Sequence, residues 1–219
     1  MKGMKKAALG LGGMMWLLAT AVMAAEPVSK VAWNVETLKL VKHGDADQGK
    51  AKAAMCESCH GAAQAATPNP YLQGQLATYL FKQMQDYKSG VRANPIMQGM
   101  VGNLKDQDMA DIAAYYAEAE LPAPQPAKGS TDTAEALAKR GDPARILTPC
   151  SVCHGGGKGQ PIDNPALAGQ KAAYLEQTLL AYRSGERKND IYGRMRTLAA
   201  RLSPAEIAEL ARYYAAEGR

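Results

Sequence analysis

Aromatic side chains are scarce in this sequence. They make up 6% of the 219 residues, and ten of the thirteen are tyrosines. Small domains bury a limited share of their surface, so cores with so few large side chains need another means of filling. Long basic runs are also missing, which argues against nucleic-acid binding. No segment alternates apolar and polar residues in the manner of a strand, so the predicted fold class is all-α.

The N-terminus has no acidic residue and one apolar run. Lys2, Lys5 and Lys6 precede the apolar residues 7–21, and the small-residue sequence Val22-Met23-Ala24 follows. This pattern predicts a cleaved signal peptide over residues 1–25 and hence a periplasmic protein. The alternative is an uncleaved anchor, although the run is shorter than the roughly 20 residues that span a bilayer; loose membrane association also stays open. Without residues 1–25 the chain has 23 basic and 21 acidic residues.

The rest of the chain is an internal duplication. Residues 72–96 align without gaps to residues 167–191, and twelve of the 25 positions are identical at an offset of 95. Tyr115-Tyr116 then matches Tyr213-Tyr214 at an offset of 98, so the second copy has a three-residue insertion between these blocks. Self-similarity of this kind indicates two domains of the same fold.

A proline-rich segment separates the two copies. Leu121 to Pro126 contains alternating prolines, which give an extended spacer. We therefore place the domains at 44–120 and 131–219, with a linker at 121–130. The extension 26–43, which contains Trp33, has no counterpart in the second copy; it either packs on the first domain or serves as a docking strap.

Helical signals recur in both copies. Ser203-Pro204-Ala205-Glu206 is a capping box with proline at the first helical position. Apolar residues then follow with the spacing of one helix face. Residues 79–87 and 174–182 predict another helix in each copy, ended by Ser-Gly.

Each copy begins with a C-x-x-C-H motif, the attachment signature of c-type haem. The motifs are Cys56 to His60 and Cys150 to His154. Cys56 and Cys59, like Cys150 and Cys153, are spaced to form thioethers with the two vinyl groups of one haem, and the adjacent histidine supplies the proximal iron ligand. Two disulfides, a zinc site and a redox C-x-x-C are the alternatives. A zinc site would need a fourth ligand, and each copy offers only two cysteines and one histidine close together. A redox C-x-x-C needs no following histidine, so it does not explain the His in both motifs.

Methionine is the usual sixth ligand of cytochromes c. Met195 is the only methionine after the second motif, whereas Met97 and Met100 both follow the first. At the offset of 98 Met97 pairs with Met195, and at 95 Met100 would replace it. We favour Met97 because the following helix must hold the ligand.

Proline follows each histidine at a similar distance. Pro70 and Pro165 lie ten and eleven residues after His60 and His154. A rigid turn there offers a backbone carbonyl to the second ring nitrogen of the histidine. The alternative is that both prolines merely begin the next helix.

These motifs in this order resemble the two-haem cytochrome c4 family over residues 44–219: C-x-x-C-H, Asn-Pro-x-Leu-x-Gly-Gln, Tyr-Leu, Tyr-(Lys/Arg)-Ser-Gly-x-Arg, Met, and Tyr-Tyr. The resemblance implies two class I cytochrome c domains about a pseudo-twofold axis. It implies two covalent haem c groups, with iron ligated by His60 with Met97 and by His154 with Met195, and with the histidine protons held by Pro70 and Pro165. The Trp33 extension and the stretch 189–194 depart from the family pattern, which leaves the docking partner open.

The resemblance further implies outer-sphere electron transfer and no catalysis. The expected donor is a quinol-oxidising complex or a dehydrogenase, and the expected acceptor is a terminal oxidase. One alternative is the electron-accepting cytochrome subunit of a sulfur-compound dehydrogenase. The other is a two-haem enzyme, which would need an iron with an exchangeable sixth position.

Overall fold

The computed structural model describes residues 29–124, 126–155 and 161–218. The predicted signal peptide, residues 1–25, lies outside this range. The described residues contain helices and no β-strand, with one isolated bridge between Asp142 and Leu147. The all-α prediction is confirmed. None of the described helices is long and apolar enough to cross a membrane.

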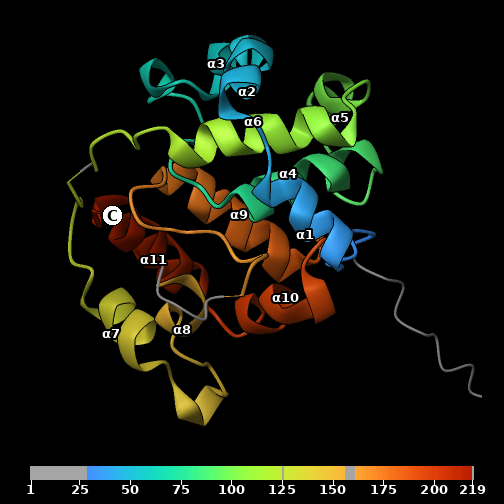
Figure 1. Ribbon diagram of the computed structural model, residues 1–219. Coiled ribbons are helices and arrows are strands. Elements are labelled where there is room, and N and C mark those ends of the chain that lie inside the picture. Colours follow the sequence, from blue (N-terminus) through green and yellow to red (C-terminus); the bar gives the residue numbers. More distant parts are fainter. Residues whose placement is uncertain (1–28, 125, 156–160, 219) are drawn as a thin grey trace, which may run out of the picture.

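The chain folds into two helical halves, drawn in blue to green and in yellow to red in Figure 1. The first half contains α1 (Val35–Lys42), α2 (Ala46–Lys52), α3 (Ala54–His60), η1 (Ala62–Gln64), α4 (Ala77–Lys88), α5 (Pro95–Val101) and α6 (Asp106–Glu118). The second contains α7 (Asp132–Arg140), η2 (Pro143–Arg145), α8 (Ser151–His154), α9 (Ala172–Ser184), η3 (Ile191–Gly193), α10 (Arg194–Ala199) and α11 (Pro204–Ala216).

Each half has its own hydrophobic core. In the first, α6 packs against α1, α2 and α4, and the core centres on Phe81, Met109 and Tyr116. In the second, α11 packs against α7 and α9, around Leu175, Ile207 and other aliphatic side chains. The apolar faces of α6 and α11 that the sequence predicts are thus the centres of two separate cores.

Local sequence signals set the helix ends. The capping box of α11 forms as predicted: the Ser203 hydroxyl accepts a hydrogen bond from the Glu206 amide at 3.2 Å, and the Glu206 carboxylate accepts one from the Ser203 amide at 2.8 Å. Glu206 also forms an ion pair with Arg145 at 2.8 Å, which ties α11 to η2. Helix α9 ends at Ser184, and Gly185 follows it with a φ of +78° that favours glycine.

The extension packs on the first domain, which is one of the two predicted arrangements. Helix α1 contacts α4 and α6, and the Trp33 ring lies 6.4 Å from the Phe81 ring. Ser29 reaches further, because its hydroxyl donates to the Asp86 carboxylate at 2.6 Å. Ser29 therefore joins this segment to α4.

Candidate haem sites

The first C-x-x-C-H motif forms the last turns of α3. His60 at its end is buried, and its Nδ1–H donates to the Pro70 carbonyl at 2.8 Å. A carbonyl only accepts hydrogen bonds, so Nδ1 carries the proton and Nε2 keeps a free lone pair. Desolvation by burial lowers the pKa of His60 and favours this neutral, metal-binding form.

The second motif repeats this arrangement at Cys150 and α8. His154 Nδ1–H donates to the Pro165 carbonyl at 2.7 Å, and burial again lowers the pKa of the imidazole. Both prolines thus place a carbonyl against a histidine. Such a partner fixes the tautomer and orientation of a ligating imidazole.

Sequence reasoning missed one residue in each copy that holds the motif in place. Asn69 donates its amide N–H to the Cys59 carbonyl at 3.4 Å, and Asn164 donates to the Cys153 carbonyl at 3.2 Å. Each asparagine directly precedes one of the two prolines. The recurring Asn-Pro pair therefore joins the turn to the last two residues of the C-x-x-C-H motif, and this recurrence was the signal that could have revealed it.

A cavity of about 1090 Å³ extends through both domains and brings the predicted site together. All ten predicted side chains or turns line it: Cys56, Cys59, His60, Pro70, Met97, Cys150, Cys153, His154, Pro165 and Met195. Small-molecule sites occupy roughly 300–1,000 Å³, so this volume suits more than one ligand of moderate size. Met100 lies one turn after Met97 on α5 and lines the same cavity.

The two domains meet through reciprocal hydrogen bonds. Gln75 donates to the Ala166 carbonyl and accepts from its amide, both at 2.9 Å. Gln170 donates to the Tyr71 carbonyl at 2.8 Å and accepts from its amide at 2.9 Å. Gln75 and Gln170 are equivalent at the offset of 95, as are Tyr71 and Ala166. Such reciprocity is the mark of twofold symmetry.

Arginines also cross this boundary in pairs. Arg92 donates to the Tyr174 hydroxyl and Arg187 to the Tyr79 hydroxyl, each at 3.2 Å. Both guanidiniums also bond the side-chain oxygen of Gln83. Among the described residues neither has a carboxylate partner, and Nη1 of Arg187 is buried with no partner at all.

Comparison with known proteins identifies the family. A family model described as Cytochrome c matches residues 46–119 and 139–215. Cytochrome c4 of Pseudomonas aeruginosa is 41% identical over 175 residues, which cover 78% of this chain and 87% of that protein. The chain belongs to the cytochrome c4 family.

Two further similarities extend the comparison. The crystal structure of reduced recombinant cytochrome c4 from Pseudomonas stutzeri superposes with a TM-score of 0.73 at 35% identity, covering 80% of this chain and all of that one. A thiosulfate dehydrogenase electron acceptor of Stutzerimonas stutzeri is 39% identical over 213 residues, covering 93% of this chain and 95% of that protein. The predicted architecture of two cytochrome c domains is therefore correct.

As a member of this family the chain carries two covalently attached haem c groups, one for each C-x-x-C-H motif, and functions in electron transfer. The residues present fit these groups. All four thiols are free of disulfides, and the described residues contain no cluster of three or more His, Cys, Asp and Glu for a zinc ion. Two guanidiniums without carboxylate partners suit the carboxylates that haem brings, because buried charges require partners.

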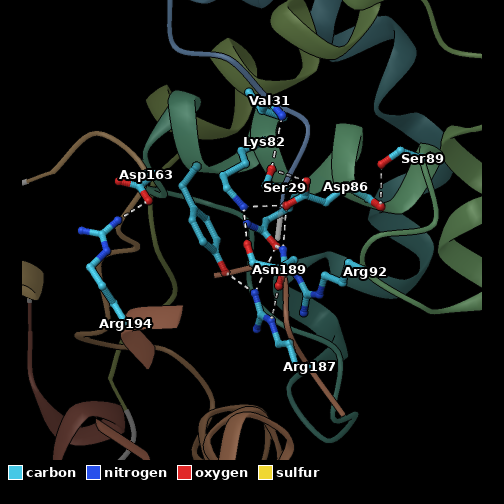
Figure 2. A network of polar contacts seen from close by, with 12 residues as sticks. Ser29, Val31, Lys82, Asp86, Ser89, Arg92, Asp163, Arg187, Asn189 and Arg194 are labelled. Atoms are coloured by element: carbon cyan, nitrogen blue, oxygen red, sulfur yellow. Dashed lines mark hydrogen bonds and ion pairs between the residues drawn. The ribbon is translucent and has the colours of Figure 1, made fainter. Parts of the chain in front are cut away.

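A second polar cluster lies beside this boundary and has no equivalent in the other copy. Figure 2 shows Lys82 and Asp86 of α4 meeting Asn189 of the second domain. Lys82 Nζ donates to the Asp86 carboxylate at 2.6 Å and to the Asn189 carbonyl at 2.7 Å. The positions equivalent to Lys82 and Asp86 are Gln177 and Ala181, so this cluster breaks the pseudo-twofold symmetry.

Proposed function

We propose that this protein is an exported electron carrier in which both irons have one histidine and one methionine ligand. The supporting observation is that His60 and His154 each donate Nδ1–H to a proline carbonyl and line one cavity with Met97 and Met195. Haem held in this way supplies one-electron chemistry, and methionine ligation raises its reduction potential.

The protein's own residues would do the positioning. Pro70 and Pro165 hold the proton on Nδ1, which leaves Nε2 of each imidazole for iron. Cys56, Cys59, Cys150 and Cys153 would form the thioethers, and Arg92 and Arg187 would bind haem carboxylates at the domain boundary. Fixed ligands keep both redox states in nearly the same geometry, which suits outer-sphere transfer.

The domain limits follow the same proposal. Residues 44–120 and 131–219 would each bind one haem, joined by the linker 121–130 and preceded by the extension 26–43. Residues 1–25 would be removed on export to the periplasm. N-terminal sequencing of the mature protein tests this last point, because an uncleaved anchor would leave Met1 in place.

The ferric visible spectrum tests the ligands, because a methionine sulfur bound to ferric haem gives a weak far-red band. We expect two haems' worth of this band. Met97→Ala and Met195→Ala should each remove half of it, while the matched variant Met100→Ala leaves it intact. If Met100→Ala removes half and Met97→Ala none, the ligand is Met100. An iron that lacks the band in the unmutated protein, or binds carbon monoxide readily, would overturn the carrier proposal for that domain and favour an enzyme.

The electron donor would be a quinol-oxidising complex or a dehydrogenase, and the acceptor a terminal oxidase. One observation favours a thiosulfate dehydrogenase as donor. The Stutzerimonas stutzeri electron acceptor aligns over 93% of this chain, compared with 78% for the Pseudomonas aeruginosa cytochrome c4, so its alignment includes part of the N-terminal extension. Reduction of the ferric protein by a thiosulfate dehydrogenase and thiosulfate, but not by thiosulfate alone, would support this donor.

A further inference from the structure

The three-residue insertion of the second copy lies directly before Met195, where η3 meets α10. Helix α5 buries Val101 and α10 buries Ala199, which are equivalent at an offset of 98, so the inserted residues are Tyr192, Gly193 and Arg194. The first copy passes directly from Ile96 to Met97. The insertion therefore adds a surface to one haem site that the other lacks.

Tyr192 stands out among the three inserted residues. Its side chain is 91% exposed, although the residue also lines the cavity, so it stands at the cavity mouth. Its φ of +57° and ψ of +19° lie in the left-handed region, which is unusual for a residue other than glycine or asparagine. Gly193 continues in the same region with a φ of +66°. Strained backbone that presents a bare aromatic ring is a reason to look for a function.

Two arginines follow Tyr192 closely in the sequence, and each forms an ion pair. Arg194 pairs with Asp163 at 2.6 Å, as Figure 2 shows, and Arg196 pairs with Asp190 at 2.8 Å. The side chains of the two carboxylates are only 11% and 3% exposed, whereas those of the two guanidiniums are 37% and 34% exposed. The cations therefore face solvent and the anions lie beneath them.

The corresponding surface of the first domain has a different character. Residues 93–104 contain no charged side chain, and Ile96 beside Met97 is an exposed apolar residue, at 74% exposure. The two cavity mouths thus differ in charge and in their exposed apolar residue. A partner that binds through charged residues would distinguish them.

We propose that Tyr192, Arg194 and Arg196, here called the Tyr192 face, form the docking surface for a redox protein with an acidic face. Tyrosine and arginine are the residues that most often dominate binding at interfaces, as an anchor surrounded by a polar rim. Outward cations steer an acidic partner and fix its orientation. A second copy of this chain fits poorly, because twofold contact would place the same cations against each other.

This inference rests on the proposed carrier function and names its partner class. The probe is flavodoxin hydroquinone, a small acidic flavin protein, mixed with the ferric holoprotein in a stopped-flow instrument. The absorbance of the reduced haems gives the second-order rate constant. Ascorbate serves as a small reductant that needs no protein docking.

Tyr192→Asn removes the ring and retains a residue that tolerates the left-handed backbone. We expect it to lower the rate constant for flavodoxin about tenfold, a typical loss for an interface anchor. Tyr192→Phe should retain the rate. Ile96→Asn, the matched change at the other cavity mouth, should alter it less than about twofold, as expected for a residue outside the anchor. The unmutated rate should fall about tenfold or more from low salt to 0.5 M, roughly the range in which screening removes steering.

Two results separate the possible failures. If ascorbate does not reduce the unmutated holoprotein, the carrier proposal fails. If ascorbate reduces every variant equally and flavodoxin shows neither a salt dependence nor a difference between Tyr192→Asn and Ile96→Asn, the docking surface is wrong while the carrier stands. Loss of binding to phosphatidylglycerol vesicles in Tyr192→Asn, without a change in the flavodoxin rate, would likewise overturn the protein-docking assignment in favour of a membrane.

Discussion

Replacing Asp86 with alanine should destabilise the protein strongly, because it leaves a buried charge alone. The Asp86 side chain is fully buried and accepts hydrogen bonds from Lys82 at 2.6 Å, Asn189 at 2.7 Å and Ser29 at 2.6 Å. The Lys82 side chain is only 3% exposed. Removing one partner of a buried pair costs about 3–5 kcal/mol, most of it the penalty for the remaining charge.

The second copy supplies the matched control. It has glutamine and alanine where the first has Lys82 and Asp86, and it buries no ion pair there. Lys82→Gln combined with Asp86→Ala should therefore cost less than half as much as Asp86→Ala alone, because no charge is left behind. Asn189 also keeps its 2.9 Å hydrogen bond to Gln83 in the double variant.

The midpoint of thermal unfolding of the holoprotein, followed by far-ultraviolet circular dichroism, measures both effects. A protein of this size loses about 2–4 °C per kcal/mol, so Asp86→Ala should lower the midpoint by about 6–20 °C. If the single variant loses less than about 3 °C, or the double variant loses as much as the single one, the buried charge is not the dominant factor.

The pH dependence gives an independent check on the same variant. Burial lowers the pKa of Lys82 below its ordinary 10.5, although the charge of Asp86 opposes this. Without Asp86 the pKa falls further. A buried lysine destabilises while it is protonated, so its cost is present below the folded-state pKa and is relieved as the pH rises through that value. The difference in unfolding free energy between Asp86→Ala and the unmutated protein should therefore become smaller at alkaline pH. A difference that becomes larger there would contradict the reasoning.

Two further predictions concern the domain boundary and α11. Gln75→Ala and Gln170→Ala should lower the free energy of unfolding equally, each by roughly 1–3 kcal/mol, because each removes hydrogen bonds to buried backbone groups of the other domain. Clearly unequal shifts of the unfolding midpoint would contradict the pseudo-twofold contact. The hydrogen bond from the Arg145 guanidinium lowers the pKa of Glu206 from 4.5 to about 2. Glu206→Gln should thus cost up to about 1 kcal/mol at pH 7, since the pair is partly exposed, and this difference should vanish as the pH falls from 4.5 towards 2; a difference that persists at pH 2 would exclude the ion pair as its cause.

Short motifs predicted the parts of the structure that depend on local chemistry. C-x-x-C-H, the capping box at Ser203 and the proline after each histidine all act within a few residues or one turn, so the sequence shows them directly. Helix α1 was not predicted, because its apolar face is short and has no repeat to compare. The preference for Met97 over Met100, drawn from the offset of 98, stays a prediction, since both residues lie on α5 and line the same cavity.

The contacts between domains required the structure for a different reason. Nothing in the spacing of Lys82, Asp86 and Asn189 indicates that 103 residues of intervening chain return to place the last two side by side. The cluster also has no counterpart in the other copy, so the duplication could not point to it. Tyr192 is similar, because an insertion is visible in an alignment but its exposure and backbone conformation are not.

The duplication nevertheless contains information about the domain boundary, which comes from the residues that are identical in both copies. Some residues far from the haem motifs are identical in both copies, and this identity needs a physical cause. Gln75, Tyr79 and Arg92 indicate that the cause is contact between the domains. Each contacts the other domain, and its equivalent makes the corresponding contact in return. On a pseudo-twofold axis one residue type must serve both sides of the contact, so these positions resist divergence. Away from that axis Lys82, Asp86 and the Tyr192 insertion are free to differ, so two otherwise similar haem sites have different surroundings.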